Sequence, residues 1–158
     1  MISIIVATDE DLLIGKKDSF NGMPWNVPED LKHFKATTVN KTILMGLTTY
    51  KAIGRPLPNR KTIVVSLEPF EDERVEVRDS LEEVIEEYRQ SGKDLFISGG
   101  ASIYQQCLPL ADQLLISRIP GKHTGETYFP SFDEYDYRLV EEKPFETFTL
   151  QIYRRGGK

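Results

Sequence analysis

Short apolar runs that alternate with helix-length segments constrain the fold of this chain more than any other feature. The first run, Ile2 to Ala7, is continuous and has the length of a strand, which is typical of a central strand buried on both faces of a sheet. Further strands are predicted at 42–45, 61–66, 75–78, 94–98 and 113–119, and helices at 47–53, 80–91 and 101–108.

The end of the chain has a different pattern. Segments 138–142 and 147–154 flank a turn at 143–146, and they predict an antiparallel hairpin. The sequence therefore predicts an α/β fold with a mixed, mostly parallel central sheet, an antiparallel C-terminal hairpin and helices on both faces. Because no segment resembles a linker, residues 1–158 are expected to form a single domain.

Composition excludes several classes of function. The net charge of −5 and the absence of a Lys/Arg run argue against nucleic-acid binding, and no apolar segment suggests a membrane span or a signal peptide. The single Cys107 cannot form an internal disulfide, and His33 and His123 lie far apart in the sequence. We expect a cytoplasmic monomer that has no metal site and binds neither nucleic acid nor membrane.

The most informative stretch for function is M-P-W-N-V-P-E-D-L-K-H-F, at residues 23–34. It contains the only tryptophan, Trp25, and two prolines, which stiffen the chain before a helix. Asn26 and Glu29 have the spacing of an N-cap residue and its N3 partner, so they predict where this helix begins.

Asp30 is the carboxylate of this helix that is expected to lie among apolar side chains, because it shares a face with Leu31 and Phe34. The other polar residues of the turn are expected to be solvated: Glu29, Lys32, His33 and Lys35. A lone Asp in a first turn is usually explained by the helix dipole. Close to Trp25, however, Asp30 must lose water and needs a partner with donors. The N–C–NH2 edge of a pterin offers two donors to the two carboxylate oxygens.

Two turns have the composition of phosphate-binding sites. Gly46 closes a predicted strand before Thr48 and Thr49, so that N–H groups and hydroxyls converge there. Gly99 and Gly100 precede another helix and would allow a ligand to approach closely. Plain connections remain the alternative for both turns, and no G-x-G-x-x-G motif marks a Rossmann turn.

The loop at 54–60, G-R-P-L-P-N-R, presents two arginines on a backbone braced by prolines. Guanidinium groups held in this way are well suited to gripping carboxylates.

Together these motifs resemble those of the bacterial dihydrofolate reductases over essentially the whole chain. The shared stretches, in order, are I-I-V-A, I-G, M-P-W-N-V-P-E-D-L-K-H-F, T-I-L-M-G, I-G-R-P-L-P-N-R, I-S-G-G-A-S-I-Y and G-E-T-Y-F-P. The resemblance implies reduction of 7,8-dihydrofolate to 5,6,7,8-tetrahydrofolate by hydride transfer from NADPH, in support of one-carbon metabolism. Dihydrofolate and antifolate inhibitors would be the small-molecule partners.

The resemblance also implies roles for individual residues. Asp30 would bind the pterin, supported by Ser117 and Trp25 as catalytic residues. The implied substrate-binding residues are Ile5, Leu31, Phe34, Ile53, Leu57, Arg60 and Ser98. The implied cofactor-binding residues are Ala7, Ile14, Gly15, Met23, Gly46, Thr48, Thr49, Ser66, Gly99, Gly100, Ala101, Ser102, Ile103 and Tyr104.

The resemblance also implies two features of the cofactor site. The polar segment 16–22 would form a lid over the nicotinamide. After Gly46 most relatives carry an Arg that binds the 2′-phosphate of NADPH, whereas this chain has Leu47. Lys51 or Arg78 would be the substitutes, and NADH becomes a possible second cofactor.

Two alternatives to this function stay open from sequence alone. One is a related reductase of the same fold that acts on a ribitylamino-pyrimidine, although W-N-V-P-E-D argues against it. The other is a non-catalytic pterin- or nucleotide-binding module, against which the joint presence of Trp25, Asp30 and the Gly-Gly turn argues.

Overall fold

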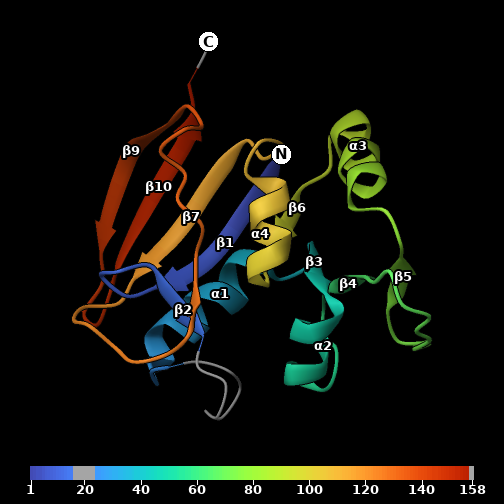
Figure 1. Ribbon diagram of the computed structural model, residues 1–158, viewed down its shortest axis with the longest axis horizontal. Helices are drawn as coiled ribbons and strands as arrows, with labels where there is room; N and C mark the ends of the chain where they lie inside the picture. The colour runs from blue at the N-terminus through green and yellow to red at the C-terminus, as the bar shows by residue number, and fades with distance from the viewer. Residues whose placement is uncertain (16–23, 157–158) are drawn as a thin grey trace.

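The computed structural model describes residues 1–15 and 24–156. Its main element is an eight-stranded sheet with the strand order β5-β4-β3-β6-β1-β7-β10-β9 (Figure 1). The strands are β1 (Ile2–Thr8), β2 (Leu13–Gly15), β3 (Thr42–Gly46), β4 (Lys61–Val65), β5 (Glu76–Arg78), β6 (Leu95–Ile97), β7 (Gln113–Arg118), β8 (Thr127–Tyr128), β9 (Tyr137–Pro144) and β10 (Thr149–Arg155). The helices are α1 (Pro28–Thr38), α2 (Leu47–Ile53), α3 (Leu81–Ser91) and α4 (Ala101–Cys107).

The predicted mixed sheet is confirmed. β1 lies between β6 and β7 and is parallel to both, and the parallel part continues through β3, β4 and β5. β10 is antiparallel to β7 and β9, so the C-terminal hairpin forms the other edge. β6 ends at Ile97 whereas β1 continues to Thr8, which opens the sheet beyond the register pair Ile4–Ile97.

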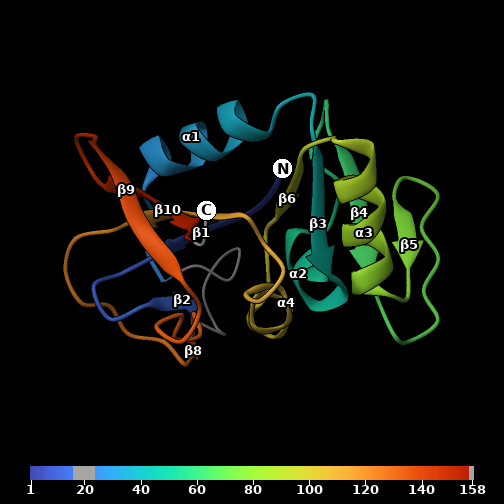
Figure 2. The same ribbon diagram turned by 90° about the horizontal axis from the view of Figure 1, so that it is seen from above.

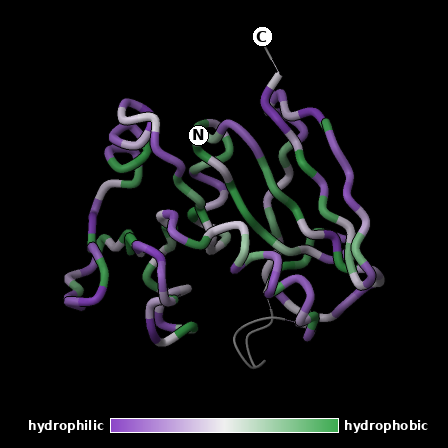
Figure 3. Tube along the Cα trace, turned by 180° about the vertical axis from the view of Figure 1, so that it is seen from behind, coloured by the Kyte–Doolittle hydropathy of each residue, from purple (hydrophilic) through white to green (hydrophobic). Residues whose placement is uncertain are grey.

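Side-chain alternation along the strands divides the core between two faces of the sheet. Ile4 and Val6 pack in one cluster with α3 and α4, whereas Ile5 packs in the other with residues of α1 and α2. Figure 2 shows α1 and α4 on opposite sides of the strands, so the prediction of helices on both faces is confirmed. Hydrophobic residues follow the central strands, whereas the outer strand β9 is mostly hydrophilic (Figure 3).

Two predictions about local structure were wrong. Asn26 does not cap α1: the N-cap is Val27, with Pro28 opening the helix and no side-chain cap, because Pro needs no backbone donor at the first helical position. No strand was predicted at 125–130, yet this segment contains β8, which pairs with β2. Gly125 packs so closely on Gly15 that a Cβ there would clash with its carbonyl oxygen, and this contact brings the two short strands together.

Candidate active site

Asp30 lies half-buried in the first turn of α1, facing the end of β7. Burial raises the pKa of its carboxyl group, and a hydrogen bond from the buried Ser117 hydroxyl offsets part of that effect. The structure thus brings together two of the three predicted catalytic residues, which are far apart in sequence. A carboxyl group with this environment can exchange protons nearer to neutral pH than an ordinary aspartate does.

The apolar residues predicted near Asp30 differ in how deeply they are buried. Phe34 and Trp25 pack against the core cluster that contains Ile5, on the same face of the sheet as Ser117. Leu31 is 51% exposed and Ile53 is 38% exposed. Leu31 and Ile53 are thus more exposed than Phe34 and Trp25, and both are available as apolar walls for a ring system.

Trp25 offers a hydrogen-bond donor at the site. Its indole Nε1 is buried, and within residues 1–15 and 24–156 it has no hydrogen-bond partner. A buried N–H group without a partner is costly, so a polar ligand atom or water is expected to satisfy it.

Helix α1 is held by the C-terminal hairpin in a way that corrects two expectations. Glu29, expected to be solvated, accepts hydrogen bonds from the backbone N–H of Thr147 at 2.8 Å and from its hydroxyl at 2.6 Å. His33, expected on the surface, lies 5.6 Å from the ring of Phe145 and 5.7 Å from that of Phe148. Burial lowers the pKa of His33, so a neutral imidazole is favoured beside Asp30.

Arg60 is braced by neutral groups. It donates to Thr38 Oγ1 at 2.7 Å, to the Pro58 carbonyl at 2.5 Å and to the Lys35 carbonyl at 2.5 Å. These bonds fix the guanidinium group without neutralising it, and Leu57 from the same loop packs on the core cluster below α1. Such an arrangement leaves the charge available to a carboxylate.

The Gly99–Gly100 turn lies against α2. The Gly46 N–H donates to the Gly99 carbonyl at 2.9 Å, and a Cβ on Gly100 would lie 3.0 Å from Thr49 Oγ1. Neither α2 nor α4 has a side-chain cap at its N-terminus. The two predicted phosphate-binding turns are therefore adjacent, and a hydroxyl and uncapped backbone N–H groups lie close together there.

The other predicted ligand residues fall around this turn and the end of β1. Tyr104 is buried and donates to the Ile5 carbonyl at 3.0 Å, which ties α4 to β1. Ser98 is half-buried and its N–H donates to the Leu44 carbonyl at 2.9 Å. Ile103 of α4 packs near Gly46, Ala101 and Ser102 open α4, Ala7 and Ile14–Gly15 lie on β1 and β2, and Thr48 is exposed on α2. Met23 and the predicted lid at 16–22 lie outside the described residues.

A family model described as dihydrofolate reductase matches residues 1–155. The chain belongs to the dihydrofolate reductase family. The dihydrofolate reductase of Bacillus subtilis (strain 168) is 41% identical over 144 residues, which cover 90% of this chain and 83% of the relative. That of Haemophilus influenzae is 40% identical over 148 residues, covering 89% and 90%.

A solved structure supports the same family. Dihydrofolate reductase from Enterococcus faecalis, complexed with NADP(H) and RAB-propyl, superimposes with a TM-score of 0.91 at 32% identity. The alignment covers 99% of this chain and 97% of the other. The predicted fold class and the resemblance on which the site residues rest are therefore confirmed.

The corner predicted to bind the 2′-phosphate of the cofactor contains both apolar and charged side chains. Leu47 is half-buried at the start of α2, and Leu67 after β4 is 90% exposed. Arg78, one predicted substitute, is bound by Glu76 at 3.1 Å and by Glu87. These carboxylates raise the pKa of Arg78 and occupy its donors, whereas Lys51 is exposed on α2. Ser66, a predicted cofactor residue, is buried and donates to the Glu68 carbonyl at 2.8 Å.

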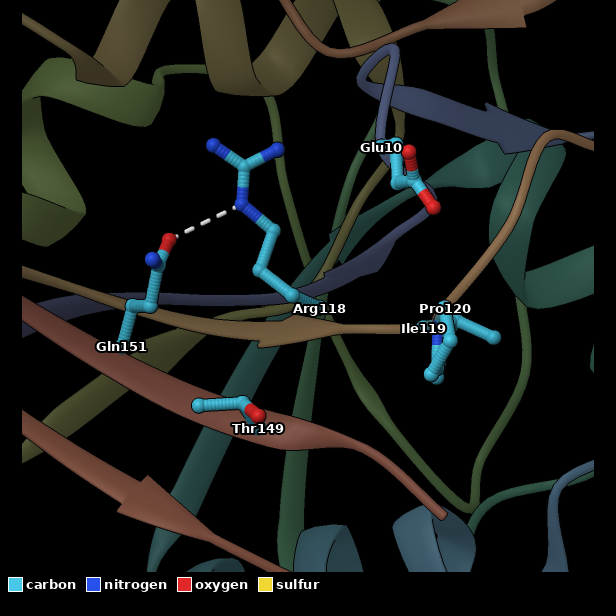
Figure 4. A pocket seen from close by; sticks show the side chains of 6 residues that line it. All are labelled: Glu10, Arg118, Ile119, Pro120, Thr149 and Gln151. Carbon is cyan, nitrogen blue, oxygen red and sulfur yellow. Dashed lines mark hydrogen bonds between the residues drawn. The ribbon is translucent and has the colours of Figure 1, made fainter.

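A separate cavity of about 320 Å³ lies at the ends of β7 and β10 (Figure 4). Its lining residues are Glu10, Arg118, Ile119, Pro120, Thr149 and Gln151. Arg118 follows Ser117 in the strand and therefore points to the opposite face of the sheet. None of the residues predicted to bind substrate or cofactor lines this cavity.

Sequence reasoning missed the contribution of the hairpin turn. Thr147 and Phe148 hold α1 through Glu29 and His33, yet they lie 118 and 115 positions away from those partners in sequence. No local sequence pattern predicts such a contact, because the partners are distant in sequence.

Among residues 1–15 and 24–156 no cluster of side chains could hold a metal ion. None of the helices described there has both the length and the hydrophobicity of a membrane span.

Proposed function

We propose that this chain reduces 7,8-dihydrofolate to 5,6,7,8-tetrahydrofolate with NADPH as the hydride donor. The observation that carries the proposal is the half-buried Asp30, whose pKa is raised by burial and whose carboxyl group is held by Ser117. Family membership supplies the reaction class, and the acid supplies the chemistry that the protein itself must contribute.

Asp30 has two tasks in this reaction. Its two oxygens accept hydrogen bonds from the amino-pyrimidine edge of the pterin, which orients the ring. Its charge then polarises the ring and favours protonation at N5, with the proton arriving through water rather than directly from Asp30. Trp25 Nε1, which has no protein partner in the described structure, is suited to hold a polar atom on this path.

The remaining substrate contacts divide between shape and charge. Leu31, Phe34 and Ile53 wall the pterin and benzoyl rings, and Leu57 contacts the benzoyl ring. Ile5 and Ser98 offer backbone carbonyls, and Arg60 grips the glutamate α-carboxylate. Because that carboxylate is remote from the reacting carbon, Arg60 contributes binding more than rate.

The residues present fit a nicotinamide dinucleotide. NADPH, when bound, supplies the hydride. The joined turn of Gly46, Thr49 and Gly99–Gly100 has the hydroxyl, the uncapped N–H groups and the close backbone approach that a pyrophosphate needs. The further residues inferred to line the cofactor are Ala7, Ile14, Gly15, Met23, Thr48, Ser66, Ala101, Ser102, Ile103 and Tyr104.

We infer a weaker preference for NADPH over NADH than in relatives that carry an Arg after this glycine. Leu47 offers no charge, and Arg78 is already paired with Glu76 and Glu87. Of the two predicted substitutes, Lys51 is the one that is exposed, on α2. We also infer a cytoplasmic monomer, in keeping with the buried, unpaired Cys107, and antifolates are expected to compete for the pterin site.

Following NADPH oxidation by absorbance, with dihydrofolate as substrate, tests the proposal. Rapid, dihydrofolate-dependent oxidation is expected. Oxidation that requires a ribitylamino-pyrimidine instead would identify the related reductase, and binding without oxidation would identify a non-catalytic module.

A further inference from the structure

The loop after β7 returns to the turn between β1 and β2 and is fastened there by a buried carboxylate. Asp9 Oδ2 accepts the His123 N–H at 2.8 Å, while Asp9 Oδ1 accepts the N–H of Asp11 at 2.8 Å and that of Leu13 at 3.0 Å. Burial opposes the charge of Asp9, but these backbone donors outweigh it and lower the pKa of the carboxyl group. Asp9 is therefore an anion that fixes the backbone of His123.

The imidazole of His123 lies between this anion and the tryptophan of the active site. Its Nδ1 is 3.7 Å from Asp9 Oδ2 and is buried, without a hydrogen bond to any residue in 1–15 or 24–156. Its ring centroid is 5.2 Å from that of Trp25, with an interplanar angle of 66°. Edge-to-face pairs of this kind restrict the orientation of both rings.

Charge decides how the imidazole is oriented. A lone pair on Nδ1 facing a carboxylate would be repelled, so Nδ1 carries the proton in the neutral ring, and Asp9 aligns that N–H.

Other charged groups on the surrounding elements are already engaged or exposed. Glu10 Oε2 accepts the Gly121 N–H at 2.6 Å. Arg118 is turned to Gln151 at 2.9 Å and to the Asp9 carbonyl at 3.3 Å (Figure 4), and Asp11 and Lys122 are exposed. Asp9 is therefore the charge that faces His123 directly.

We propose that His123 is a positioning residue for Trp25, aligned by Asp9, and that the loop after β7 thereby fixes the indole beside the pterin. The inference rests on the proposed function for its effect on the reaction. It does not rest on that function for the contact itself.

The contact between Trp25 and His123 can be measured because both residue types are rare in this chain. Trp25 is the only tryptophan, and His123 is one of two histidines. The emission of an indole depends on the groups that contact it, so the emission of the ligand-free protein reports whether Trp25 contacts His123. His33→Gln is the matched control, because it removes the other histidine.

The experiment records Trp25 emission without ligand in the wild-type protein, His123→Gln, His123→Leu and His33→Gln, and measures dihydrofolate KM and kcat for the first three. We expect the emission to change in both His123 variants and to stay as in the wild-type protein in His33→Gln. KM should rise about 3- to 10-fold in His123→Leu, the range for loss of one aromatic pair, and less in His123→Gln, which keeps a donor for Asp9, while kcat changes less than KM.

Three results would overturn the proposal: emission that is unchanged in both His123 variants, an equal change of emission in His33→Gln, or an unchanged KM in His123→Leu although its emission changes. Failure of the wild-type protein to reduce dihydrofolate would overturn the proposed function instead. The two failures are distinguishable because the emission measurement needs no ligand.

Discussion

The charged side chains at the two ends of the candidate site have opposite kinds of partner, neutral at one end and charged at the other. At the pterin end, Asp30 is half-buried among apolar groups and has the neutral Ser117 as its partner, so its pKa rises. At the corner next to α2, Arg78 forms ion pairs with Glu76 and Glu87, so its charge is neutralised within the protein. The contrast supports two parts of the proposed function: Asp30 as the acid that binds the pterin, and weaker binding of the outer cofactor phosphate.

The largest effect is expected from Asp30→Asn. A neutral amide neither matches the charged pterin edge nor favours protonation at N5, so kcat/KM should fall by ~10²–10⁴ at pH 7. Stability should not fall, because the raised pKa means that the ionised Asp30 opposes folding once the pH exceeds the folded pKa. Steady-state kinetics and urea unfolding check both statements.

Asp133→Asn, at an exposed position, is the matched control and should leave kcat/KM unchanged. Near wild-type turnover in a folded Asp30→Asn protein would remove the acid from the pterin end, and with it the contrast between the two ends.

Arg60→Ala comes next in size. Loss of a charged hydrogen bond to the glutamate carboxylate should weaken dihydrofolate by ~1.5–3 kcal/mol and leave kcat little changed, because the bond exists before and in the transition state. Binding is measured for dihydrofolate and for a pterin that lacks the glutamate tail. Arg55→Ala, exposed on the same loop, is the control. Equal weakening of both ligands by Arg60→Ala would contradict this role.

Leu47→Arg tests the cofactor corner and should have a smaller effect. Restoring a charged hydrogen bond of ~1.5 kcal/mol or more should raise the preference for NADPH over NADH by ~10-fold or more. Leu139→Arg places the same side chain on β9, where Leu139 is 46% exposed, and should have no effect. A wild-type preference of ~10³ that Leu47→Arg leaves unchanged would mean that another residue already holds the phosphate.

Glu29→Gln should have the smallest effect and concerns the attachment of α1. Hydrogen bonds from Thr147 lower the pKa of Glu29, so its stabilisation is present at neutral pH and is lost as pH falls through the folded pKa. Glu29→Gln should therefore lower the free energy of unfolding slightly at pH 7 but not in acid, because exposed partners contribute little. Glu82→Gln, in the first turn of α3, is the control; an equal loss in both variants would mean that Thr147 is not a specific partner.

Local patterns predicted most of the fold. The apolar run at Ile2–Ala7 became the central strand β1. The helix predicted at 80–91 is α3, and Ser80 caps it by accepting the Glu83 N–H at 3.3 Å. Such features depend on neighbours in sequence, where periodicity and capping act. The predicted start of α1 was wrong because Pro28 opens the helix, which makes Val27 the N-cap in place of Asn26.

The site was less predictable because its contacts are distant in sequence. The pairing of Asp30 with Ser117 was implied only by resemblance to relatives, and the burial of His33 against Phe145 and Phe148 was missed. An amphipathic pattern identifies which face of a helix is apolar. It does not identify which strand or turn will cover a polar residue at the edge of that face.

The most direct test of the contrast is the protonation of Asp30 itself. Carbon-13 NMR of the aspartate carboxyl groups in the ligand-free protein follows each titration, and the resonance absent from Asp30→Asn identifies Asp30. Burial predicts a midpoint above the ordinary value of 3.8. A midpoint at or below that value would show that the carboxyl group is as well solvated as a surface acid, and would contradict the desolvated acid on which the proposed reaction depends.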